Sequence, residues 1–251
     1  MSLLKYQKSF VCYFDVLGFS SFISDKLKVE SYFECIIDSL KRVINEVNFG
    51  SDIKYHLISD AVVLAIATED RNLIKQLREL LGKVAIIQYY LAVKNIWVRG
   101  SITYGEIGFS DDGKVISGVA LAEAYELEKL ALYPRVIIDP RICAELNMTK
   151  KDLVSTINVQ SEELGGSWIY DEDKTNYIPN MMEMRDYLFV NFMTIATRGH
   201  EDVISEVEKI YGNLRSNLYS LPPQIQKYQW VRDYIYSSNE IETLTAKFQY
   251  L

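Results

Sequence analysis

The alternation of hydrophobic and polar positions predicts that strands and helices follow one another through residues 1–140. Five short segments are rich in aromatic and β-branched side chains, as strands are: residues 9–16, 54–59, 61–67, 96–104 and 135–138. Four others carry apolar side chains at helical spacing: residues 20–27, 32–47, 72–94 and 121–132. The predicted order is therefore strand, two helices, two strands, helix, strand, helix and strand.

The central pair of strands decides between two fold classes. Residues 54–59 and 61–67 are separated by Asp60 alone, which leaves room for a hairpin but not for a crossover helix. Two strand–helix–strand halves around a hairpin are typical of an α/β (α+β) fold with ferredoxin-like, or palm, architecture. A parallel doubly wound sheet fits less well. We therefore expect a sheet that contains antiparallel strands.

The C-terminal part of the chain is less regular. Residues 149–180 are polar and contain a Gly pair, which predicts a loop with a short strand at 168–170. A strand at 187–193 and helices at 201–219 and 225–236 follow. Because no linker or repeat separates these segments from the rest, we expect residues 141–251 to form an extension that packs on a core of residues 8–140.

The charge balance bears on the partners of the protein. The 251 residues include 27 Lys and Arg against 34 Asp and Glu, a formal net charge of −7. An acidic chain is a poor binder of nucleic acids and of anionic membranes, so we expect neither as a partner. A nucleotide remains possible as a ligand, because a metal ion can offset local carboxylates.

Three cysteines, far apart and without a CxxC motif, predict neither a disulfide framework nor a zinc site: Cys12, Cys35 and Cys143. The N-terminal residues lack the apolar segment and cleavage site of a signal peptide. The longest apolar run, residues 84–93, is too short to cross a bilayer. These features together predict a cytoplasmic protein.

Two acidic residues stand in otherwise apolar strand sequences, Asp15 after Val-Cys-Tyr-Phe and Asp60 before Ala-Val-Val-Leu. A carboxylate in such surroundings costs several kcal/mol unless it is paired or bound to a metal. Taken singly, Asp60 is explained as a hairpin-turn residue and Asp15 as a helix cap. In a ferredoxin-like order, however, the first strand neighbours the central hairpin, so the two carboxylates converge. Such a pair suits Mg²⁺ or Mn²⁺.

A turn directly follows Asp15. Gly18 permits a tight turn, and a helix that begins just after it would offer free backbone N–H groups at Gly18, Phe19 and Ser20. A strand, an acid, a Gly turn and a helix N-terminus together predict a site for a metal and a triphosphate.

At four places, over residues 8–140, the sequence resembles the class III nucleotidyl cyclases. Their two metal-binding motifs resemble Phe-Asp-Val-Leu-Gly-Phe at 14–19 and Ser-Asp-Ala at 59–61. Their next strand is similar to Val-Arg-Gly-Ser-Ile-Thr-Tyr-Gly at 98–105, and a later helix motif to residues 118–128. The whole pattern is similar to that of the bacterial pyrimidine cyclases of Pycsar antiphage systems.

The sequence departs from the class III pattern at residues that act in catalysis. Ala122 and Glu126 stand where the family has the Asn and Arg that stabilise the transition state. His56 replaces the Lys that reads a purine, and its partner acid would fall at Lys114 or Val115, neither of which is acidic. The retained pair Asp15 and Asp60 therefore favours an active enzyme that reads another base.

The resemblance implies conversion of UTP or CTP to 3′,5′-cyclic UMP or CMP and pyrophosphate, as second-messenger synthesis in antiphage defence. It implies two Mg²⁺ or Mn²⁺ ions held by Asp15, Asp60 and the Val16 carbonyl. It also implies a homodimer with sites at the interface, and a separate effector that responds to the cyclic nucleotide. Base recognition is assigned to Arg99 and to Tyr55 or His56, which face opposite sides of one strand.

Two other functions remain open at this point. One is a catalytically silent cyclase-like module that binds a nucleotide or a partner. The other is a purine cyclase, adenylate or guanylate, with relocated base contacts. The sequence does not separate UTP from CTP.

Overall fold

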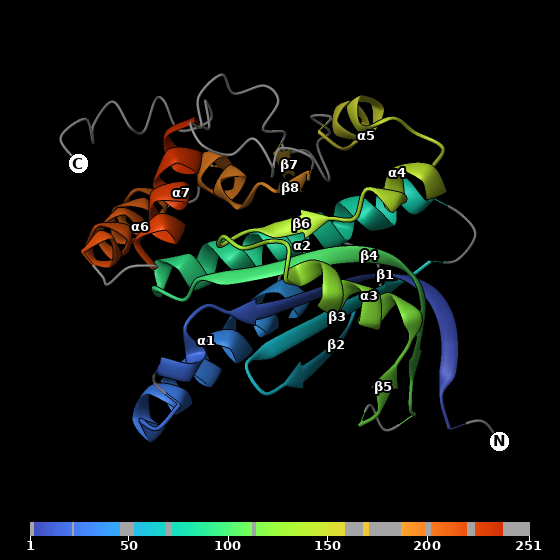
Figure 1. Ribbon diagram of the computed structural model, residues 1–251, viewed down its shortest axis with the longest axis horizontal. Helices are drawn as coiled ribbons and strands as arrows, with labels where there is room; N and C mark the ends of the chain where they lie inside the picture. The colour runs from blue at the N-terminus through green and yellow to red at the C-terminus, as the bar shows by residue number, and fades with distance from the viewer. Residues whose placement is uncertain are drawn as a thin grey trace.

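A computed structural model of the chain describes residues 3–21, 23–45, 53–68, 72–111, 114–158, 168–170, 187–198, 202–219 and 224–237. In these residues a single mixed sheet runs through the molecule, with helices on both of its faces (Figure 1). No helix in these ranges is long and apolar enough to cross a membrane.

The first half of the chain forms the ferredoxin-like arrangement. Its elements are β1 (Lys5–Val16), α1 (Lys26–Asn45), β2 (Ile53–Ile58), β3 (Ala61–Ala67), α2 (Leu73–Val93) and β4 (Val98–Phe109). In the sheet the order is β2-β3-β1-β4, and every neighbouring pair is antiparallel. This is the predicted α/β (α+β) fold class, which is confirmed. It places β1 directly beside the β2–β3 hairpin.

The second half extends this sheet. After β5 (Ile116–Ser117) and α3 (Val119–Glu128) come β6 (Val136–Ile138), α4 (Arg141–Glu145), α5 (Lys150–Ile157), β7 (Ile169–Tyr170), β8 (Phe189–Val190), η3 (Phe192–Arg198), α6 (Val203–Leu218) and α7 (Gln224–Ser237). Strand β6 pairs with β4 in parallel, and β8 and β7 follow it at the edge. The C-terminal region thus adds strands to the same sheet as residues 8–140.

Three segments differ from the prediction. The strand expected at 187–193 is limited to β8, because η3 begins at Phe192. Residues 150–157 form α5 instead of part of a loop, because Thr149 and Asp152 make a capping box in which side chain and backbone bond reciprocally. The predicted helix over 20–27 is wrong as well. Ser21 donates its backbone N–H and its hydroxyl to the Gly18 carbonyl, which closes the short 3₁₀ helix η1 (Phe19–Ser21), and α1 begins only at Lys26.

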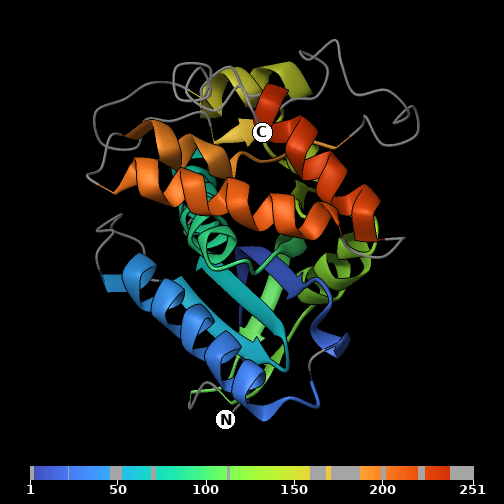
Figure 2. The same cartoon turned by 90° about the vertical axis from the view of Figure 1, so that its left-hand side faces the viewer.

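The side chains of β1 alternate between the two faces of the sheet. Phe10, Cys12 and Phe14 enter the large core beneath α1 and α2, whereas Val11 and Tyr13 join a smaller cluster beneath α3. Asp15 continues the second series and so lies on the α3 face. Helices α6 and α7 pack against each other on the far side of α2 from the β2–β3 hairpin (Figure 2).

Candidate functional site

Asp15 lies on β1 directly opposite Arg99 on β4. The Arg99 guanidinium donates from Nε to one carboxylate oxygen of Asp15 at 3.1 Å and from Nη2 to the other at 3.3 Å. Burial lowers the pKa of Arg99, but the hydrogen bond and the charge of Asp15 raise it, and the net change is upward. Asp15 is thus a strand residue held by a bidentate ion pair, and not a helix cap.

Glu128 forms a second ion pair with Arg99. Its side chain is only 3% exposed, and burial together with the nearby charge of Asp15 raises the pKa of Glu128 to about 7, although Arg99 opposes this change. One guanidinium therefore lies against two carboxylates, so protonation of Glu128 balances the charge of the cluster near neutral pH.

Glu128 is a member of the site that the sequence motifs did not predict. A signal was present, because Ala120, Ala124 and Glu128 recur every fourth residue along α3 and are its buried positions. An acid that continues an Ala stripe faces the sheet rather than water. Two hydrogen bonds hold α3 against β4 and so position Glu128. The Ser101 hydroxyl donates to the Ala124 carbonyl at 2.6 Å, and the Thr103 hydroxyl donates to the Ala120 carbonyl at 2.8 Å.

Gly100 lets β1 and β4 approach each other behind this cluster. A Cβ at Gly100 would collide with the Tyr13 carbonyl and with Phe14 on the neighbouring strand. Arg99 and Asp15 therefore keep their register because the residue beside Arg99 has no side chain. This is a packing role for the glycine of the predicted 98–105 strand.

Asp60 occupies the two-residue turn between β2 and β3, after Ser59, whose φ is 55°. The simpler interpretation of its position as a hairpin-turn residue is therefore correct. Its backbone carbonyl accepts a hydrogen bond from the Tyr32 hydroxyl at 2.9 Å. Among the described residues, no hydrogen bond or ion pair engages its carboxylate.

Two tyrosines are influenced by the charges of both Asp15 and Asp60. Burial raises the pKa of Tyr32, and the charges of Asp60 and Asp15 raise it further. Burial raises the pKa of Tyr13 to about 12, with added contributions from Asp15, Glu128 and Asp60. The pairing of β1 with β3 runs as far as Phe14 and Val62, so the fold places Asp15 at the strand end beside the hairpin turn that carries Asp60.

The turn after Asp15 has the predicted Gly but not the predicted helix. Gly18 has φ of 82°, in the left-handed region that favours glycine. Phe19 is buried against Tyr32, with ring centroids 5.2 Å apart, and Ser20 is exposed. Because η1 has only three residues, no α-helix N-terminus directs its amides to this turn. Val16 is buried and pairs with Val98 at the last position of the β1–β4 ladder.

Of the three candidate base readers, Arg99 on β4 is engaged by Asp15 and Glu128, and Tyr55 and His56 lie on different faces of β2. His56 pairs with Val63, which belongs to the cluster under α3, so His56 shares the face of Asp15. Tyr55 pairs with Leu64 of the large core and is 50% exposed. Tyr55 lines a separate pocket with Lys5 and Asp111. The structure therefore places His56, and not Tyr55, on the face of the sheet that carries Asp15.

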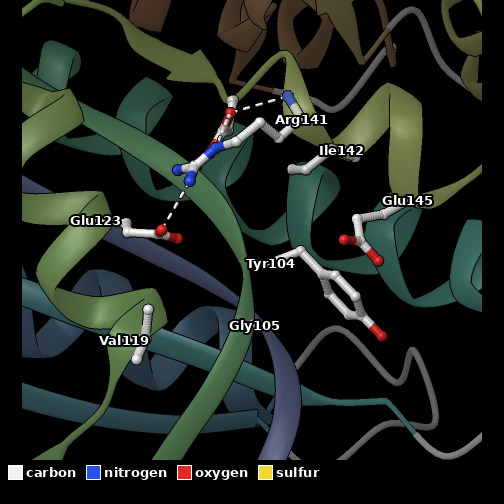
Figure 3. A pocket seen from close by; sticks show the side chains of 8 residues that line it. Tyr104, Gly105, Val119, Glu123, Arg141, Ile142 and Glu145 are labelled. Carbon is white, nitrogen blue, oxygen red and sulfur yellow. Dashed lines mark hydrogen bonds and ion pairs between the residues drawn. The ribbon is translucent and has the colours of Figure 1, made fainter.

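A pocket of about 240 Å³ lies farther along β4, between α3 and α4 (Figure 3). Arg141 bridges the buried Asp139 at 2.6 Å and Glu123 at 2.7 Å, and Figure 3 shows its guanidinium directed toward Glu123. The ion pairs raise the pKa of Arg141 and tie α3 to α4. In this network the Arg141 guanidinium pairs with two carboxylates, and none of its residues belongs to the Asp15 cluster.

The donor set determines what the cluster can hold. Across the described ranges, no group of three or more His, Cys, Asp or Glu side chains is arranged to hold a metal ion. Two converging carboxylates with a backbone carbonyl beside them still fit a hard cation that keeps much of its own water, as Mg²⁺ does. The fit has one requirement, which is that Arg99 shift from Asp15 toward Glu128.

No protein-family model matches the sequence, and comparison with curated protein sequences finds no match. Several solved structures are similar in fold. The adenylyl cyclase CyaB from P. aeruginosa has 14% identity and a TM-score of 0.46, over 57% of this chain and 82% of that one. A guanylyl cyclase domain of the RhoGC fusion protein from the fungus Blastocladiella emersonii has 12% identity and a TM-score of 0.48, over 75% and 98%.

A bacterial light-regulated adenylyl cyclase has 13% identity and a TM-score of 0.41, over 82% of this chain and 99% of that one. Likenesses this distant carry no conclusion about the activity of this chain.

Proposed function

We propose that this protein is a nucleotidyl cyclase of the class III type. Its substrate is a pyrimidine nucleoside triphosphate, UTP or CTP, and its products are 3′,5′-cyclic UMP or CMP and pyrophosphate. The observation that supports the proposal is the position of Asp15 at the end of β1, beside the β2–β3 hairpin whose turn carries Asp60. Residues 8–140 are the catalytic core in this proposal, and residues 141–251 are an extension packed on it.

Asp15, Asp60 and the Val16 carbonyl would hold Mg²⁺ or Mn²⁺, two ions per site. When bound, the ions favour ionisation of the ribose 3′-hydroxyl and offset the charge of the phosphates. In the reaction the 3′-oxygen forms a bond to the α-phosphorus as the bond from that phosphorus to the bridging oxygen breaks. Pyrophosphate leaves, and the hydroxyl proton passes to solvent.

The side chains of this chain have distinct tasks in that step. Through the ions they would hold, Asp15 and Asp60 would position the reacting phosphate and the 3′-oxygen, and Arg99 keeps Asp15 oriented until substrate arrives. The backbone N–H groups of Gly18, Phe19 and Ser20 would donate to phosphate oxygens. His56 supports the choice of a pyrimidine, because it stands on the face of the acids and replaces a purine-reading lysine.

The resemblance noted in the sequence supports the wider role, which is second-messenger synthesis in antiphage defence, in the cytoplasm, with a separate effector. It also supports a homodimer in which each site lies at the interface. Exposed apolar side chains on and after α3 are available for such a contact, among them Val119, Tyr125 and Leu130.

One observation favours a second function, a catalytically silent nucleotide-binding module. Arg99 occupies both oxygens of Asp15, and α3 carries Ala122 and Glu126 in place of the transition-state pair. A module that only binds has no need to free Asp15.

The test is incubation of the full chain with ATP, GTP, CTP or UTP and Mn²⁺, with mass detection of cyclic products. We expect cyclic UMP or CMP from the wild type and none from Asp15→Asn or Asp60→Asn. Asp111→Asn is the matched control, because Asp111 is an exposed acid paired with Lys5 and remote from the cluster. Cyclic AMP or GMP would replace the pyrimidine assignment, and no product from folded wild type would establish the silent module.

A further inference from the structure

We propose that Lys227, on helix α7 of the C-terminal extension, contacts phosphate oxygens of the nucleoside triphosphate bound at Asp15 and Asp60. The inference rests on the proposed function and adds a residue to it. It gives the C-terminal extension a part in the site and supplies a cation that α3 does not provide.

Aromatic packing fixes α7 on the core. The Trp230 ring stacks on Tyr133, with centroids 5.5 Å apart and planes at 14°. The guanidinium of the buried Arg135 lies 5.5 Å from the same indole. One turn further on, the Tyr234 hydroxyl donates to Asn191 at 2.6 Å. These three contacts, made by Trp230 and Tyr234, fix the position of α7. Lys227 lies one turn before Trp230, so its place along the helix is fixed as well.

The first turn of α7 reaches the end of β4 where the acidic cluster lies. Tyr228 packs edge-on against Trp97, with ring centroids 6.1 Å apart. The Trp97 carbonyl in turn accepts a hydrogen bond from the Leu17 amide at 2.8 Å. Leu17 is two residues after Asp15, and Trp97 is two before Arg99. The backbone of α7 at Lys227, next to Tyr228, therefore lies near the strand ends that carry Asp15 and Arg99.

The electrostatic surroundings of Lys227 agree with this placement. Burial and the charge of Arg99 lower the pKa of Lys227, while Asp15 and Glu128 act in the opposite direction. All three members of the cluster are thus close enough to act on the ammonium. In the described part of the chain, no hydrogen bond or ion pair engages that ammonium.

Other lysines near the sheet are already engaged. Lys129 pairs with Glu126 at 2.7 Å and lies over the Tyr125 ring, and Lys54 lies over Phe109. The Lys227 ammonium is half-buried and has three N–H donors. A compact positive charge of this kind is suited to bind the oxygens of a polyphosphate. The phosphates, rather than the base or ribose, are therefore the part of the substrate that Lys227 recognises.

The experiment measures binding of a nucleotide that cannot cyclise. Isothermal titration in Mn²⁺ compares 3′-deoxy-UTP with 3′-deoxy-UMP on wild type, Lys227→Met and Lys227→Arg. We expect Lys227→Met to weaken triphosphate binding about tenfold and monophosphate binding less than about twofold, while Lys227→Arg stays within about threefold of wild type. Arg232→Met is the control, because it removes a cation from the same helix at a residue paired with Asp233.

Thermal unfolding of each variant confirms that it is folded. Equal triphosphate affinity in Lys227→Met and wild type would overturn the role of Lys227 and leave the proposed function standing. An equal loss for both nucleotides would overturn it too, since that result indicates a general distortion. A wild type that neither binds 3′-deoxynucleoside triphosphates nor forms cyclic products refutes the proposed function itself.

Discussion

Asp15 and Arg99 face each other across β1 and β4, and the guanidinium donates to both oxygens of the carboxylate. The same guanidinium pairs with Glu128 on α3. Arg99 therefore holds together two acids that would otherwise repel each other, and one of them is a proposed metal ligand. This contact links the stability of the fold to the state of the site.

Replacement of Arg99 by Ala leaves Asp15 and Glu128 close together without a cation. We expect a loss of about 2 kcal/mol in the free energy of unfolding, less than the roughly 3–5 kcal/mol for breaking a fully buried pair, because the Arg99 side chain is 27% exposed. Urea unfolding measures the loss. Added Mn²⁺ should restore part of the stability of this variant, because a cation then replaces the guanidinium.

The control for that experiment is Lys129→Ala, which breaks an exposed pair with Glu126 and should change stability little. A stable Arg99→Ala protein without Mn²⁺ would show that the ion pairs contribute nothing to the fold.

Glu128 should give the stability of the metal-free protein a pH dependence. Its pKa of about 7 in the folded state lies above the value of about 4.3 expected in the unfolded chain. The folded protein therefore retains a proton that the unfolded chain releases. The resulting stabilisation is complete below about pH 4 and is lost as the pH rises through 7.

Glu128→Gln removes this titration. The free energy of unfolding of the wild type should therefore fall relative to that of Glu128→Gln between pH 4.5 and 7.5, measured with a chelator present. Glu126→Gln, an exposed acid on the same helix, should run parallel to wild type. Parallel curves for Glu128→Gln as well would contradict the raised pKa.

The opposite orientations of Tyr55 and His56 predict different effects of the two alanine variants. His56 shares the face of Asp15, so His56→Ala should lower kcat/KM for the preferred nucleotide about tenfold. Tyr55→Ala, one residue away on the other face, should change it less than about threefold. Steady-state kinetics with all four nucleotides decide, and the reverse ranking would place the base on the Tyr55 side.

Gly100 should tolerate no side chain. Gly100→Ala places a Cβ against the Tyr13 carbonyl and Phe14, and we expect a loss of about 1–3 kcal/mol in the free energy of unfolding. Gly212, inside α6, has open space around its Cβ position, so Gly212→Ala should gain about 0.5–1 kcal/mol. Denaturant unfolding of both variants tests this contrast. Equal effects would mean that β1 and β4 can separate at little cost.

Much of the fold could be predicted from local sequence. The apolar strand and helix patterns gave the element order, and the very short connection between the strands now seen as β2 and β3 required a hairpin. From this order follows the position of β1 beside the hairpin, and with it the approach of Asp15 to Asp60. The capping box of Thr149 and Asp152 was also a local signal for α5, although the polar composition of that segment pointed to a loop.

The partners of Asp15 could not be predicted in the same way. Arg99 faces Asp15 only because the β1–β4 register aligns them, and that register depends on close packing at Gly100. Glu128 joins them because α3 packs on β4 through Ser101 and Thr103. These contacts link residues far apart in sequence, so no local pattern contains them.

The sequence by itself determined the ferredoxin-like order and the two acids that the order brings together, because hydrophobic periodicity and turn length act locally along the chain. Only the tertiary structure decided that Asp15 is held by Arg99, that Glu128 shares this cation and that Lys227 stands beside them. The physical reason is that charges interact through space, and their separations depend on how the sheet, α3 and α7 pack together.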